Sequence, residues 1–130
     1  MKMYAKKVSA IASGDYYQVH FDSEEGDEDD LDPFEQSAPY LMVQSQFEFS
    51  DGGKCYVETV EEKYIGHFKL KLIEFTSTRI EFKIARPKNN HVEVCFALTA
   101  TEFEEILPIV EVIFGIREPD YDEQIFDGSL

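Results

Sequence analysis

The chain has 130 residues, 43% hydrophobic and 14% aromatic, which is enough apolar material for one domain with a core and unlike a disordered chain. Twenty-seven Asp and Glu oppose twelve Lys and Arg, and the formal net charge of −15 repels nucleic acid and anionic membranes while attracting cationic partners. No apolar run approaches the roughly 20 residues that span a bilayer, and no secretory signal pattern is found, so we expect a cytoplasmic protein that binds neither nucleic acid nor membrane.

Two strands joined by a tight turn are predicted near the start of the chain, over residues 8–12 and 16–21. The turn between them contains Gly14, which supplies the glycine that a tight hairpin needs. Apolar and polar side chains alternate along the second strand, as expected when one face of a sheet is buried. The inward set of that strand is Tyr17, Val19 and Phe21.

Residues 22–36 break this pattern because acidic side chains dominate and Pro33 interrupts the segment. We expect a solvated loop whose carboxylates repel one another. Asp27, Asp29 and Asp30 are oxygen donors of the kind that calcium prefers, but the glycine, the bidentate glutamate and the flanking helices of an EF-hand are missing. The sequence therefore favours loose association of counter-ions over a specific calcium site.

Five further strands are predicted between residues 40 and 98, separated by short turns that contain Gly, Asn, Pro, Ser and Thr. Each strand alternates apolar with polar side chains, so each presents one face to a core. The expected strands span residues 40–49, 55–60, 64–75, 80–84 and 92–98.

The spacing of apolar residues changes to that of a helix over residues 103–114. Two capping boxes are possible at the start of this helix, Thr99 with Glu102 or Thr101 with Glu104. Either box would satisfy backbone amides that have no partner within the helix.

Two residues bear on the course and the end of this helix. Pro108 lies inside it and is expected to kink it, since proline lacks the amide proton and clashes with the preceding turn. Gly115 stands where a helix C-terminus takes a left-handed residue. Beyond it, residues 116–130 form an acidic tail that we expect to be partly ordered.

Strands followed by one helix, without βαβ alternation, predict an α+β fold. We expect a mainly antiparallel sheet of about seven strands with the C-terminal helix packed on its apolar face. Residues 1–115 are expected to form a single domain into which the acidic loop 22–36 is inserted, with residues 116–130 as its tail.

The residue types that carry catalysis and metal binding show no recognisable spacing. His20, His67 and His91 lie in or beside predicted strands, away from any nucleophile motif, and we expect no ligand role for them. Cys55 and Cys95 are too few for a disulfide scaffold or a zinc site and are expected to be buried or half-buried thiols. The sequence thus predicts a protein that is not an enzyme and that has no metal and no cofactor.

The combination of tyrosine and carboxylate side chains favours a protein-binding surface aimed at a basic partner. A tyrosine in a strand is more often a half-buried side chain that packs against its neighbours. The prediction of a binding surface therefore rests largely on the acidic loop. The candidate partner-binding residues are Asp27, Glu28, Asp29, Asp30, Gln44, Glu48, Tyr56 and Glu58. An exposed edge strand would also allow two copies to pair as a homodimer.

Five strand signatures precede the helix that ends at Gly115, and together they carry a resemblance. They are Tyr40-Leu41-Met42-Val43-Gln44, Phe47-Glu48-Phe49, Tyr56-Val57-Glu58, Tyr64-Ile65-Gly66 and Val92-Glu93-Val94-Cys95-Phe96-Ala97-Leu98. In order and spacing, residues 39–115 resemble the immunity protein 10 family of bacterial polymorphic toxin systems. Ser45 stands where members of that family often carry arginine.

The resemblance implies a cytoplasmic antidote that binds and blocks a cognate toxin domain and has no enzymatic activity of its own. Many such toxins are basic nucleases, so an acidic inhibitor would fit them. Three alternatives stay open: an acidic nucleic-acid mimic that inhibits a host or phage defence protein, a calcium- or small-ligand-binding module, and an enzyme of unrecognised type.

Overall fold

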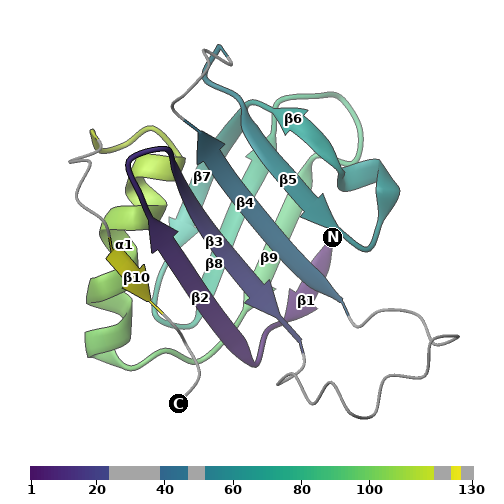
Figure 1. The fold of residues 1–130 in the computed structure, drawn as a ribbon. Coiled ribbons are helices and arrows are strands. Elements are labelled where there is room, and N and C mark those ends of the chain that lie inside the picture. Colours follow the sequence, from purple (N-terminus) through teal and green to yellow (C-terminus); the bar gives the residue numbers. More distant parts are fainter. Residues whose placement is uncertain (24–38, 47–51, 119–123, 127–130) are drawn as a thin grey trace, which may run out of the picture.

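The computed structural model describes residues 1–23, 39–46, 52–118 and 124–126 (Figure 1). Within these residues the chain forms a six-stranded sheet, a four-stranded sheet and one α-helix. The predicted α+β class is confirmed. The candidate residues Asp27, Glu28, Asp29, Asp30 and Glu48 lie outside the described residues.

The six-stranded sheet is mostly a meander of antiparallel neighbours, in the order β10-β2-β3-β4-β5-β6. Its strands are β2 (Lys7–Ala12), β3 (Tyr16–Asp22), β4 (Tyr40–Gln46), β5 (Cys55–Thr59), β6 (Gly66–Phe68) and β10 (Gln124–Phe126). The predicted first hairpin is confirmed as β2 and β3. Strand β10, from the predicted tail, pairs with β2 along the edge of this sheet.

The four-stranded sheet has the order β1-β9-β8-β7, and its strands are β1 (Lys2–Tyr4), β7 (Leu70–Phe75), β8 (Arg79–Ile84) and β9 (His91–Cys95). Strand β1 runs parallel to β9, whereas the other pairs are antiparallel. A short 3-10 helix, η2 (Glu62–Tyr64), follows β5, and α1 (Ala100–Ile113) follows β9.

The prediction of a single sheet of about seven strands was wrong, since the described residues form ten strands in two sheets. The segment expected to be one strand over residues 64–75 crosses from one sheet to the other. Strand β6 pairs with β5 and strand β7 pairs with β8, and only Lys69 lies between them. Phe68 and Leu70 are half-buried on either side of the exposed Lys69. The alternation of apolar and polar residues continues in phase through the crossing, so periodicity alone does not reveal it.

The core lies between the two sheets and the helix. Phe21 of β3 stacks on Phe96, which follows β9, with 5.7 Å between ring centroids. The helix packs against β2, β3 and β4 of the six-stranded sheet. It also meets the edge strand β7 of the other sheet, where the rings of Phe75 and Phe103 lie 5.1 Å apart. Figure 1 shows the six-stranded sheet in front, with β7, β8, β9 and α1 behind it. One face of the six-stranded sheet is therefore covered and the other is turned outward.

The ends of α1 follow the sequence signals. Thr99 accepts a hydrogen bond from the amide of Glu102, and the Glu102 side chain accepts one from the amide of Thr99, which is the capping box at the first of the two predicted positions. Gly115 follows the helix with φ of 74°, as predicted for its C-terminal end. The helix continues through Pro108 over its full span. In the described part of the chain, no helix has the length and apolar character to cross a membrane.

A candidate protein-binding face

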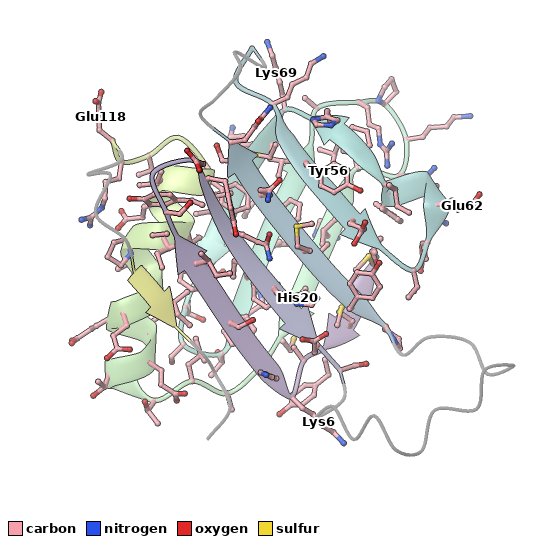
Figure 2. The ribbon with its side chains drawn as sticks, viewed as in Figure 1. Lys6, His20, Tyr56, Glu62, Lys69 and Glu118 are labelled. Carbon is pink, nitrogen blue, oxygen red and sulfur yellow. The ribbon has the colours of Figure 1, made fainter. Side chains whose placement is uncertain are left out.

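The outward surface of the six-stranded sheet, here called the front face, gathers half-buried polar and aromatic side chains. Figure 2 views this face, with His20 and Tyr56 labelled on it. It arises because the apolar residues of each strand point inward, which leaves the alternate residues outside. Its central members are Gln18, His20, Asp22, Tyr40, Met42, Gln44, Tyr56, Glu58 and His67.

The strand register brings four of these side chains into one row across β3, β4, β5 and β6. Gln18 lies opposite Gln44, Gln44 opposite Tyr56, and Tyr56 opposite His67. The Gln44 side-chain amide donates to the Gln18 side-chain oxygen at 3.2 Å, and the rings of Tyr56 and His67 lie 5.2 Å apart. These contacts fix the side chains of the row before any partner arrives.

Glu58 is held by two tyrosine hydroxyls. Tyr40 donates to its Oε2 at 3.2 Å and Tyr56 donates to its Oε1 at 3.0 Å. The pKa of Tyr40 is raised by burial and by the charge of Glu58, and the pKa of Tyr56 is raised above all by its hydrogen bond to Glu58. The carboxylate is therefore positioned on the face by two neutral hydroxyl groups.

A second small group lies at the β3–β4 end of the front face. The rings of His20 and Tyr40 meet edge to face, with centroids 5.7 Å apart. His20 Nε2 lies 3.4 Å from Asp22 Oδ1. Met42 lies opposite both His20 and Glu58 in the register, and Tyr40, which also donates to Glu58, links the two groups.

The acidic segment joins the front face at this same end. Asp22, the last residue of β3, lies opposite Tyr40, the first residue of β4. Just beyond this pair, the amide of Ser23 donates to the carbonyl of Pro39 at 3.2 Å. Ser23 and Pro39, which flank the eight acidic residues of positions 24–38 in the sequence, therefore lie at one edge of the face.

Three of the predicted residues, Gln44, Tyr56 and Glu58, lie together on the front face as direct or diagonal neighbours. Four further residues of this surface, Gln18, His20, Tyr40 and Met42, were not among those predicted from the sequence. Each is the alternate, outward residue of a strand whose apolar face was recognised. Only the register between strands, which the sequence does not give, places them side by side.

A separate charged cluster lies on the outer surface of the four-stranded sheet. Glu81 of β8 contacts both Arg79, with 2.7 Å between Arg79 Nη2 and Glu81 Oε1, and His91, through Oε2. The hydrogen bond from His91 and the charge of Arg79 together hold the pKa of Glu81 below its ordinary value. Glu93 lies directly opposite Glu81 on β9. No ligand role was predicted for His91 from the sequence. The alternation of β9 places His91 and Glu93, two residues apart in one strand, on the same surface as Glu81.

No family model matches the chain, and searches of curated proteins and of solved structures return no match. The resemblance to the immunity protein 10 family therefore stays a prediction from the sequence.

Proposed function

We propose that the chain is an immunity protein that binds a cognate bacterial toxin domain through the front face and neutralises it by occlusion. The observation that carries this proposal is the arrangement around Glu58, in which two tyrosines and an ordered row of amide side chains present one carboxylate on an open sheet surface. Tyrosine and methionine are enriched at protein interfaces.

The chemistry of the front face favours a basic partner. An arginine or lysine of the toxin would meet the Glu58 carboxylate between the rings of Tyr40 and Tyr56. There the cation would form an ion pair with the carboxylate and cation–π contacts with the tyrosine rings. The acidic segment beside the face supplies the longer-range attraction. A toxin surface shaped to bind phosphate would offer such cations, and the inhibitor would cover them.

Co-expression with the toxin domain encoded beside this chain tests the proposal. We expect the wild-type chain to restore growth and to co-purify with the toxin. The double variant Tyr56→Ala/Gln44→Ala removes side chains from the centre of the face without touching the core. It should weaken binding by about 30-fold or more, since truncating a single hot-spot residue, a class in which tyrosine is enriched, costs about 2 kcal/mol or more.

The matched control is Glu105→Gln, an exposed residue of α1 on the opposite side of the six-stranded sheet. It changes one exposed side chain away from the front face and should protect cells as well as the wild type. Failure of the wild-type chain to protect would contradict the proposed function. Full protection by a folded double variant would instead contradict the assignment of the front face.

A further inference from the structure

The outer surface of the four-stranded sheet places three glutamates in one row. Glu74 lies opposite Glu81, and Glu81 lies opposite Glu93, on the neighbouring strands β7, β8 and β9. Like charges directly opposite each other in a sheet are destabilising. The row therefore requires cations close to its carboxylates.

Among the described residues, two cations contact these carboxylates, and they meet this need only in part. Arg79 reaches Glu74 at 3.2 Å and Oε1 of Glu81 at 2.7 Å, which leaves Oε2 of Glu81 turned toward His91. Lys2 lies 3.6 Å from Glu93, but its side chain is 73% exposed, whereas that of Glu93 is only 17% exposed. A contact to so exposed a lysine is strongly screened by water.

The geometry of the cluster suits a metal ion. Ligand atoms of Glu81, His91 and Glu93 all lie within 4.8 Å of one another. They come from two hydrogen-bonded strands, β8 and β9, so the backbone holds them in place. Tetrahedral ligands placed about 2.1 Å from a zinc ion are separated by about 3.4 Å. The Glu81 and His91 atoms, which are hydrogen-bonded at 2.5 Å without the ion, would move apart to admit it.

We propose that Glu81, His91 and Glu93 form a binding site for a zinc-type divalent transition-metal ion. One imidazole nitrogen and two carboxylate oxygens are a ligand set that zinc accepts, with a water completing the tetrahedron. Calcium and magnesium prefer oxygen ligands throughout, so the histidine selects against them. The proposal stands apart from the toxin-binding function, because this surface belongs to the other sheet.

Such an ion would join β8 to β9 and offset the repulsion between Glu81 and Glu93. The thiol of Cys95 donates to Glu93 Oε1 at 3.7 Å and orients that carboxylate from the side, as neighbours of metal ligands commonly do. Because the ion would bind the folded chain, saturating zinc should raise the Tm.

Isothermal titration of the untagged full chain with zinc chloride tests the site. We expect one ion per chain, with affinity reduced at least ten-fold in the variants His91→Gln and Glu93→Gln. Substituting His67→Gln, a histidine of β6 on the front face, is the matched control and should leave the affinity unchanged. Circular dichroism of each variant establishes that the sheets remain folded.

Two further readouts separate this site from loose binding to the acidic segment. The ring signals of His91 in NMR spectra should shift on addition of zinc, and a large excess of calcium should neither cause the shift nor prevent it. Zinc binding of equal strength in the His91→Gln/Glu93→Gln double variant, or no binding at all by the wild type, would overturn the proposal.

Discussion

Glu58 shows how single side chains give the front face its chemistry. Both of its carboxylate oxygens accept hydrogen bonds from phenols, and both phenols respond with raised pKa values. The ionised carboxylate favours the protonated form of each tyrosine, since a hydroxyl can donate to it and a phenolate cannot. Tyr40, Tyr56 and Glu58 therefore behave as one unit on the surface.

The first prediction concerns the titration of these tyrosines. Substituting Glu58→Gln removes the charge and should lower the pKa of Tyr40 and Tyr56 toward the ordinary value of 10.0. Alkaline titration of the phenolate absorbance, with Tyr40→Phe and Tyr56→Phe to assign the signals, measures this. The control Glu62→Gln, an exposed glutamate of η2, should change nothing, and an equal response in both variants would contradict the arrangement.

The raised pKa values of Tyr40 and Tyr56 also make the stability of the fold depend on pH. A tyrosine whose pKa is raised in the folded state stabilises the fold fully below pH 10 and loses that contribution as pH rises through the folded pKa. Wild-type stability should therefore fall above pH 10, and it should fall less steeply in Glu58→Gln. Urea unfolding at a series of alkaline pH values follows this, and a steeper fall in the variant would contradict it.

At the scale of elements, local signals predicted local structure. The hairpin of β2 and β3, the alternation within each strand, the capping box at Thr99 and the left-handed Gly115 all follow from neighbours in sequence. The partition into two sheets did not follow, because it depends on which distant strands pair. The parallel pairing of β1 with β9 joins residues about 90 positions apart, and no turn motif in the sequence predicts it.

In the candidate site, too, some residues could be predicted from local sequence and others could not. Outward residues such as Gln44, Tyr56 and Glu58 were identifiable from alternation and composition, whereas Tyr40 and His20 join them only through the register of β3, β4 and β5. Where a polar residue lies along a strand is a local property. Which polar residue lies beside it depends on the assembled sheet.

The capping box gives a prediction for α1. Replacing Thr99→Ala removes the side chain that accepts from the amide of Glu102, and it should lower the free energy of unfolding by about 0.5–2 kcal/mol. Thr101→Ala is the control, since Thr101 is exposed in the first turn and belongs to the alternative box. Equal losses in the two variants, measured by urea unfolding, would argue against Thr99 as the cap.

At the scale of the whole molecule, the acidic residues and the candidate binding surface belong largely to different segments of the chain. The described front face holds few carboxylates, while residues 24–38 hold many. We infer that the acidic segment accelerates encounter with a basic partner and that the front face holds the partner once it has docked. Electrostatic steering of this kind changes association rates more than dissociation rates.

Neutralising the segment tests this division of roles. The variant Asp27→Asn/Glu28→Gln/Asp29→Asn/Asp30→Asn should slow association with the neighbouring toxin domain by about ten-fold at low salt. The difference from the wild type should shrink as salt is added, because screening removes steering. Surface plasmon resonance at several salt concentrations measures both rates, and inhibition that persists at high salt with no loss in this variant would count against a role for charge.

Hydroxyl-radical footprinting of the complex with the toxin domain tests the central claim most directly, because methionine, tyrosine and histidine are reactive and lie on the front face. We predict that Met42, Tyr40 and Tyr56 become protected, while Tyr4, which is 57% exposed at the edge of the four-stranded sheet, keeps its reactivity. Protection of Tyr4 together with unchanged reactivity of Met42 and Tyr56 would contradict the account.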